Sequence, residues 1–314
     1  MLKPIVVVAA LCISVSALAS TPPALTPQTY ASQLGVGMIV DWAITERGIR
    51  EFDPLAVKDF QQRGIGHVRI RVAGEPTHQR LVHLQKIVEA CQQYHVVPII
   101  SYQAGTESEG KIVAWWSAVA RYFAQSSPQL GFDILYEPAE KLNHTQLNAL
   151  YEKATKAIHK VSPQRMIFIA PPVYTRPDSL KWPEQNHAPV LADWHLFPYG
   201  PVAVNGKRGW TTGTPAEKAA IRARINSVLR WQQKSGHSSW VGAWSVGEIV
   251  KNTPAAQQIA FATFVACELQ KNHLPYAVNK DSKFYDGEEG AWRPETQPLL
   301  DAILKPQCKS WVFR

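Results

Sequence analysis

The chain has 314 residues, of which 46% are hydrophobic and 18% charged, and its formal net charge at pH 7 is +8. This length exceeds that of a usual domain but is typical of one large α/β core. The positive charge favours anionic surroundings such as cell-wall polymers. Because the Lys and Arg residues are dispersed among acids rather than gathered into a stripe, nucleic acid is not expected as a partner.

The first residues have the pattern of a cleaved secretory signal. Lys3 precedes an apolar run from Ile5 to Val15, and the small-residue pattern Ala17-Leu18-Ala19 follows. We expect residues 1–19 to be removed near Ala19, which lowers the formal charge from +8 to +7, and the product to be secreted or periplasmic. A membrane anchor is the alternative, but the run is shorter than the ~20 residues that a spanning helix needs.

Three cysteines remain after this cleavage, so the mature chain can form at most one internal disulfide. Cys267 lies in a late predicted helix and Cys308 in the C-terminal tail, and the two could meet when a barrel closes. Cys91 belongs to an early apolar helix. The alternative is three buried free thiols, because sequence does not fix connectivity. No CxxC or HExxH spacing occurs, so we expect neither a structural zinc nor another cofactor.

Short β-branched runs alternate with longer stretches of helical spacing about eight times, which is typical of a parallel sheet built from βα units. The predicted strands are Gly35–Val40, His67–Val72, Val96–Ser101, Phe132–Glu137, Met166–Ala170, Leu191–Leu196, Trp240–Ser245 and Tyr276–Asn279. The predicted helices are Pro54–Arg63, His78–Tyr94, Lys111–Ala124, Thr145–Val161, Pro215–Lys234, Ala255–Lys271 and Glu295–Leu304.

This rhythm predicts a single (β/α)₈ TIM barrel from Ser20 to the end of the chain. Thr214-Pro215 and Thr253-Pro254 each place a capping hydroxyl before a first-turn proline, where the rhythm requires a helix to begin. The fifth crossover, around Leu180–Pro183, is poorly formed. A doubly wound open sheet is the alternative, but no Gly-rich phosphate loop follows the first strand.

Catalytic residues of such barrels lie at the C-terminal ends of the strands. The polar and aromatic residues at these ends are Asp41, Trp42, Arg69, Arg71, Ser101 to Gln103, Glu137, Tyr174, His195, Glu248 and Asn279. Glu137 and Glu248 close the fourth and seventh strands, so their carboxylates should face each other across the barrel mouth. Retaining glycoside hydrolysis uses such a pair, roughly 5 Å apart.

On these residues the chain resembles the cellulase-type glycoside hydrolases of family five over nearly its whole mature length. The run from Gly64 to Ile70 is similar to the family's second-strand motif, which implies that Arg69 supports the nucleophile. The run from Phe132 to Pro138 resembles the acid/base strand, which implies that role for Glu137. His195 matches the sixth-strand histidine, and Gly247-Glu248 matches the nucleophile motif. The stretch Gly213–Lys218 also resembles family members that act as endoglucanases.

Four family contacts to the sugar are altered. Tyr136 stands where the family has the asparagine that contacts the sugar 2-hydroxyl, and Gln103 replaces the third-strand histidine. Phe197 replaces a tyrosine, with Tyr199 as a displaced substitute, and Asn279 replaces the eighth-strand tryptophan. Hydrogen bonds to the 2-hydroxyl strengthen in the transition state, so either the substrate differs or the activity is weak.

The aromatic residues near strand ends are further candidates for substrate contacts. Trp42, Trp210 and Trp244 fall at strand ends or in the loops above them and could stack on sugar faces. The polar candidates could instead have purely structural roles. His195 could be a core histidine bonded to backbone, Arg69 could pair with an inward-facing acid, and Glu137 could end a strand at a solvated turn.

The resemblance implies a monomeric, secreted retaining hydrolase that cleaves a β-linked poly- or oligosaccharide in the manner of an endoglucanase, without a cofactor. One alternative is a carbohydrate-binding pseudoenzyme on the same barrel, which the four altered contacts would suit. Another is a transglycosylase. The presence of both glutamates favours an enzyme over a binding module.

Overall fold

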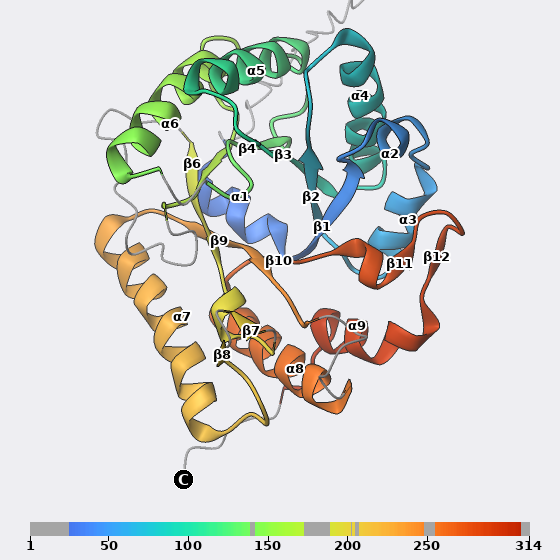
Figure 1. The fold of residues 1–314 in the computed structure, drawn as a ribbon, viewed down its shortest axis with the longest axis vertical. Coiled ribbons are helices and arrows are strands. Elements are labelled where there is room, and N and C mark those ends of the chain that lie inside the picture. The colour runs from blue at the N-terminus through green and yellow to red at the C-terminus, as the bar shows by residue number, and fades with distance from the viewer. Residues whose placement is uncertain are drawn as a thin grey trace, which may run out of the picture.

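Eight parallel strands form a closed ring in the order β1-β10-β9-β6-β5-β4-β3-β2 (Figure 1). The computed structural model describes residues 25–138, 142–172, 189–201, 203–204, 207–247 and 255–308. The predicted (β/α)₈ barrel is confirmed. Its strands are β1 (Val36–Ala43), β2 (His67–Val72), β3 (Val97–Tyr102), β4 (Gly131–Asp133), β5 (Ile167–Ile169), β6 (Val190–His195), β9 (Ser239–Trp244) and β10 (Tyr276–Val278).

Helices surround the ring and cover its outer face (Figure 1). They are α3 (Leu55–Gln62), α4 (His78–Gln93), α5 (Glu109–Tyr122), α6 (His144–His159), α7 (Pro215–Ser235), α8 (Ala255–Lys271) and α9 (Gln297–Leu304), all within a few residues of the predicted bounds. The predicted cap of α7 is present, because the Thr214 hydroxyl accepts a hydrogen bond from the Glu217 backbone N–H. Apolar residues at helical spacing face the barrel, such as Leu81, Leu84 and Val88 in α4.

Within the described residues, two short helices precede α3, and neither was predicted. Helix α1 (Pro27–Leu34) covers the end of the barrel at which the strands begin, because Leu34 contacts the first residue of β2 and Tyr30 bonds to Gln129 just before β4. Tyr30 and Leu34 join the inner core there. Helix α2 (Glu46–Arg50) follows β1. The Thr26 side chain caps α1 and Pro27 opens it, so the sequence carries the same Thr-Pro signal that marked the later helices.

The fourth strand is shorter than predicted. It ends at Asp133, and the segment from Ile134 to Glu137 is irregular. Side chains from other elements hold this segment, because the Ile134 carbonyl accepts a hydrogen bond from Trp116 Nε1 and the Tyr136 carbonyl accepts one from Arg69 Nη2. Glu137 therefore stands four residues beyond its strand, in a stretch of backbone fixed by these contacts.

Two small hairpins extend the loops between barrel strands. Strands β7 (Ala203–Val204) and β8 (Lys207–Arg208) pair between β6 and α7. Strands β11 (Tyr285–Asp286) and β12 (Ala291–Trp292) pair between β10 and α9, and the Tyr285 hydroxyl donates a hydrogen bond to Asp59 of α3. This second hairpin therefore reaches across the chain to the elements that follow β1.

The predicted disulfide is confirmed. Cys267 of α8 and Cys308 of the C-terminal tail are bridged, with their Cα atoms 5.6 Å apart. Cys91 is a buried free thiol, and burial raises its pKa. The bridge ties the tail to the helix that precedes the last barrel strand.

Several predicted features fall outside the described residues. These are the signal segment, the fifth crossover around Leu180–Pro183, Tyr174, the Thr253-Pro254 cap and Glu248. Among the helices that the structure does describe, none combines the length and the apolar character needed to cross a membrane.

Candidate active site

Glu137 lies at the mouth of the barrel, beyond the end of β4. Its side chain is 33% exposed, and Oε1 lies 3.6 Å from Nδ1 of His195, which ends β6. One side of the carboxyl group is thus open to a ligand, and the other side faces the His195 ring.

Glu248 lies outside the described residues, so its distance from Glu137 stays a prediction. The described chain continues from β9 through Ser245 to Gly247, the residue directly before it. Along the chain Glu248 follows the last residue of β9 by four positions, as Glu137 follows the last residue of β4.

A buried ion cluster lies beneath this part of the mouth. Arg69 is 0% exposed and donates hydrogen bonds to Asp133 of β4 and, at 2.7 Å, to Asp193 of β6. It also donates to the Tyr136 carbonyl at 3.0 Å, and Ser101 of β3 donates to Asp133. Arg69 therefore pairs with two inward-facing acids, and this pairing joins β2 to β4 and β6 through one guanidinium group. Support of Glu248 by Arg69 stays a prediction, because Glu248 lies outside the described residues.

The two acids of the cluster differ in their proton affinity. Burial raises the pKa of Asp133 to about 7 against the opposing effect of Arg69. Burial would also raise the pKa of Asp193, but Arg69 and His195 outweigh it and hold that pKa below its usual value. Since both carboxylates share one guanidinium, Asp133 is the one that takes up a proton first.

His195 connects the cluster to Glu137. Its Nε2 lies 3.3 Å from Nη1 of Arg69 and, at a longer 3.5 Å, from Oδ2 of Asp193. The two ring nitrogens therefore face different groups, with Nε2 toward Arg69 and Asp193 and Nδ1 toward Glu137. His195 is therefore a link in a side-chain network and not a core histidine bonded only to backbone.

Tyr136 is enclosed between two arginines. The guanidinium carbons of Arg69 and Arg71 each lie 4.4 Å from the centre of its ring, and the residue is 4% exposed. Burial raises the pKa of its hydroxyl well above the usual value. The ring thus stabilises two cations, and an amide that could contact a sugar 2-hydroxyl is absent from this position.

A second charged group lies closer to solvent at the same mouth. Arg71 donates to Asp41 Oδ1 at 2.8 Å and to Gln103 Oε1 at 2.9 Å, and Lys280 Nζ donates to Asp41 Oδ2 at 2.6 Å. The side-chain oxygen of Gln103 therefore accepts a hydrogen bond from Arg71, whether or not Gln103 also contacts a substrate. Asn279, next to Lys280, is half-buried, and its side-chain oxygen has no hydrogen-bond partner within the described chain.

The three tryptophans predicted to stack on sugars lie in different environments. Trp42 is half-buried and lines a hollow beside the mouth. Trp210 and Trp244 are 1% and 0% exposed, and both pack against Phe261 of α8, so neither offers a face to a sugar. Their apolar rings fill the space between the barrel and its helices, which corrects the sequence-based expectation for these two residues.

Tyr199 is half-buried in a short 3₁₀ helix, η2 (Phe197–Tyr199), after β6. Its hydroxyl accepts a hydrogen bond from Arg224 of α7 at 3.3 Å. Phe197 packs edge-on against the His195 ring at a centroid distance of 5.3 Å. Of these two aromatic residues, Phe197 therefore packs on the histidine, and Tyr199 bonds to α7.

Sequence reasoning missed Asp133 and Asp193. Each is the one acid in a short, largely apolar strand, and each bonds to Arg69 inside the barrel. That pattern is a usable signal, because a buried carboxylate in a strand requires a buried cation. Across the described ranges, no group of three or more His, Cys, Asp or Glu residues has an arrangement that would hold a metal ion.

Comparison with known proteins agrees with this geometry. The model of the family described as cellulase (glycosyl hydrolase family 5) matches residues 30–279. The chain belongs to glycosyl hydrolase family 5. It is 20% identical to Endoglucanase H of Acetivibrio thermocellus over 320 residues, which is 91% of this chain but 34% of that relative. This family 5 chain thus spans about a third of the length of its curated relative.

Solved structures share the fold. A hyperthermophilic endo-β-1,4-glucanase in complex with substrate superposes with a TM-score of 0.76 at 20% identity, covering 89% of this chain and 99% of that one. Cel5A of Thermotoga maritima in complex with cellobiose gives 0.75 at 18% identity, covering 88% and 99%. The cellulose synthase subunit Z of Clostridioides difficile gives 0.72 at 19% identity, covering 86% and 99%.

Proposed function

We propose that this chain is a retaining glycoside hydrolase that cleaves a β-linked poly- or oligosaccharide, with Glu137 as acid/base and Glu248 as nucleophile. The observation that carries the proposal is the position of Glu137 in a family 5 barrel, partly exposed at the mouth and facing Nδ1 of His195. Glu137 protonates the leaving oxygen while Glu248 attacks the anomeric carbon. Water then releases the sugar with Glu137 as base, and the chemistry needs no metal or organic cofactor.

The substrate that we propose is a β-glucan, cut internally, because the relatives are named as endoglucanases. Export to the periplasm or medium, with cleavage near Ala19, is part of the proposal. The Cys267–Cys308 bridge supports it, since disulfides persist mainly in oxidising compartments.

A carbohydrate-binding pseudoenzyme is the second candidate, and Tyr136 favours it. Its enclosed ring supplies no amide for the sugar 2-hydroxyl, a contact that contributes several kcal/mol to the transition state in this class of enzyme. Such a loss would lower the rate on ordinary glucans by orders of magnitude.

Two substitutions separate the candidates. Glu248→Ala should abolish turnover of every β-glycoside, and added azide or formate should restore part of it. Glu137→Ala should spare the glycosylation step on a dinitrophenyl glycoside, which needs little protonation, far more than hydrolysis of a polysaccharide. The unmutated chain should show a bell-shaped pH profile, because turnover needs one carboxyl group ionised and the other protonated.

The matched control is Glu152→Gln, on the exposed face of α6, which should leave kcat/KM unchanged. If a panel of β-glucans, mannans and xylans is bound but not cleaved, and neither active-site substitution changes that binding by more than a few fold, the hydrolase proposal fails.

A further inference from the structure

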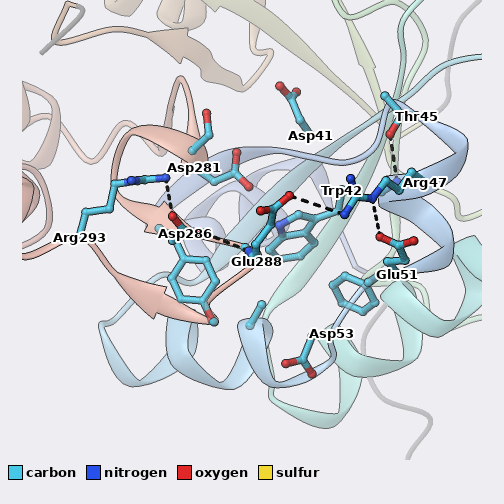
Figure 2. A pocket seen from close by; sticks show the side chains of 17 residues that line it. Asp41, Trp42, Thr45, Arg47, Glu51, Asp53, Asp281, Asp286, Glu288 and Arg293 are labelled. Atoms are coloured by element: carbon cyan, nitrogen blue, oxygen red, sulfur yellow. Dashed lines mark hydrogen bonds and ion pairs between the residues drawn. The ribbon is translucent and has the colours of Figure 1, made fainter. Parts of the chain in front are cut away.

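A hollow of about 720 Å³ opens beside the barrel mouth, between the elements that follow β1 and those that follow β10. One wall comes from Trp42, α2 and the segment after it, and the other from Asp281 and the β11–β12 hairpin (Figure 2). This volume lies within the ~300–1,000 Å³ typical of small-molecule sites. Asp41 lines the hollow and also belongs to the charged group at the barrel mouth, so the hollow adjoins the candidate active site.

The lining is acidic although the chain as a whole is basic. It contains two guanidinium groups, Arg47 and Arg293, against six carboxylates. These carboxylates belong to Asp41, Glu51, Asp53, Asp281, Asp286 and Glu288. Arg293 pairs with Asp286 at 2.8 Å, and Arg47 pairs with Glu51 at 2.7 Å and with Glu288 at 3.7 Å (Figure 2). Asp41 is paired with Arg71 and Lys280 at the mouth, so Asp53 and Asp281 are the lining carboxylates that form no ion pair within the described chain. These two groups favour a cationic ligand.

Asp281 distinguishes this hollow from an ordinary acidic surface. The residue is 7% exposed, and its Oδ1 has no hydrogen-bond partner among the described residues. Burial and the nearby charge of Asp41 raise its pKa to about 7. A buried oxygen without a donor is costly, and a ligand in the hollow that brings an N–H or O–H donor to it would remove that cost.

The walls also carry aromatic rings. Trp42 and Phe52 lie with their ring centres 5.1 Å apart and both line the hollow, as does Tyr285 of the hairpin. Aromatic rings beside hydrogen-bonding carboxylates suit a sugar, whose C–H faces pack on rings while its polar groups bond to acids.

We propose that this hollow binds a β-linked hexosamine unit with a free, protonated amino group, and that Asp281 accepts a hydrogen bond from that ammonium group. A neutral sugar hydroxyl would satisfy the same oxygen, but it would leave Asp53 and Asp281 without a cationic partner. An ammonium group supplies both the donor and the charge. The inference rests on the proposed function in one respect, namely that the bound polymer continues into the mouth at Glu137.

Binding measurements test this without relying on turnover. We would titrate the full chain with tetraglucosamine, tetra-N-acetylglucosamine and cellotetraose by calorimetry at pH 6.5, and repeat the titrations in the Glu137→Ala background so that no ligand is consumed. Tetraglucosamine should bind at least tenfold more tightly than either neutral ligand. Asp281→Asn, which keeps the shape of the side chain, should reduce that preference to threefold or less.

Two further variants serve as a second probe and a control. Asp53 lies on the opposite wall and is exposed, so Asp53→Asn should weaken tetraglucosamine binding by a smaller factor than Asp281→Asn does. Glu89→Gln removes one negative charge from α4, outside the lining, and should change nothing. Circular dichroism melts of each variant would verify that the fold is intact.

The outcomes separate this inference from the proposed function. Equal binding of the three ligands, or a preference that survives Asp281→Asn, overturns the amino-sugar site even if the chain hydrolyses glucans. A preference that depends on Asp281 in a chain that cleaves no β-glycoside supports the site while the hydrolase proposal fails.

Discussion

The Arg69 cluster and the hollow beside it contain the same residue types but use them differently. In the cluster, Arg69, Asp133 and Asp193 are fully buried, and they bond to one another across several strands. In the hollow, the ion pairs join partly or largely exposed side chains, and the buried Asp281 forms no ion pair within the described chain. All three buried acids, Asp133, Asp193 and Asp281, keep one oxygen without a hydrogen-bond partner among the described residues. The cluster pairs its carboxylates with a shared cation, whereas the hollow holds a buried carboxyl group that is available to a cationic ligand.

The largest expected effect comes from breaking the cluster. Arg69→Met should lower the free energy of unfolding by about 3–5 kcal/mol, because two buried carboxylates lose the cation that they share. Urea denaturation followed by tryptophan fluorescence would measure the loss. Arg69→Lys should recover only part of it, since an ammonium group cannot reproduce the forked contacts to two acids. A variant as stable as the parent would show that the cluster is dispensable.

The disulfide lies outside both regions and provides a reference of intermediate size. A closed loop of 41 residues corresponds to about 4 kcal/mol of stabilisation in the chain-entropy model, before strain is subtracted. The double variant Cys267→Ser/Cys308→Ser should therefore melt at a lower temperature while its ligand affinity and pH profile stay unchanged. Altered affinity would mean that the bridge shapes the mouth as well as the tail.

Asp281→Asn should raise stability at alkaline pH. A carboxyl whose pKa is raised by folding, here from 3.8 to about 7, binds more protons in the folded than in the unfolded state. Its contribution to the free energy of unfolding therefore falls as pH rises through this interval. The gain should be absent at pH 3.5 and reach roughly 1–3 kcal/mol at pH 8, below the ~4 kcal/mol that the full shift would imply.

Asp193→Asn is the matched variant in the cluster and should behave in the opposite way. Burial alone would raise the pKa of the Asp193 carboxyl group, but Arg69 and His195 hold it below the usual value in the folded protein. The charged form of Asp193 therefore stabilises the fold. That contribution is present above the unfolded pKa and is lost as pH falls through the folded pKa. The variant should be less stable than the parent at pH 8. Changes of the same sign in both variants would contradict the contrast between the two regions.

The smallest effect should come from the surface pairs of the hollow. Glu288→Gln removes an ion pair to Arg47 in which both side chains are largely exposed. Exposed pairs contribute little to stability, so the melting temperature should not change measurably. A drop of several degrees would mean that this pair holds the hairpin in place.

Sequence patterns predicted the barrel, its helices and the disulfide because they depend on local periodicity and on chain order. Hydrophobic spacing placed α4 within one residue of its observed end, and a strand-end glutamate marked the mouth. The ion cluster was not predicted, because Arg69 and Asp193 are separated by 124 residues and only barrel closure brings them together. Trp210 was misassigned for a related reason, since the helix that buries it is formed much later in the chain.

Helix α1 closes the end of the barrel at which the strands begin. Tyr30 anchors it through a hydrogen bond to the Gln129 carbonyl, and the Leu34 carbonyl bonds to His67 inside β2. Proteolytic trimming beyond Thr26 would remove the N-terminal cap of this helix and let water reach the space beneath the Arg69 cluster. The higher local dielectric constant would reduce the difference in pKa between Asp133 and Asp193. The predicted cleavage site near Ala19 lies seven residues before that cap, so cleavage at this site would leave helix α1 intact.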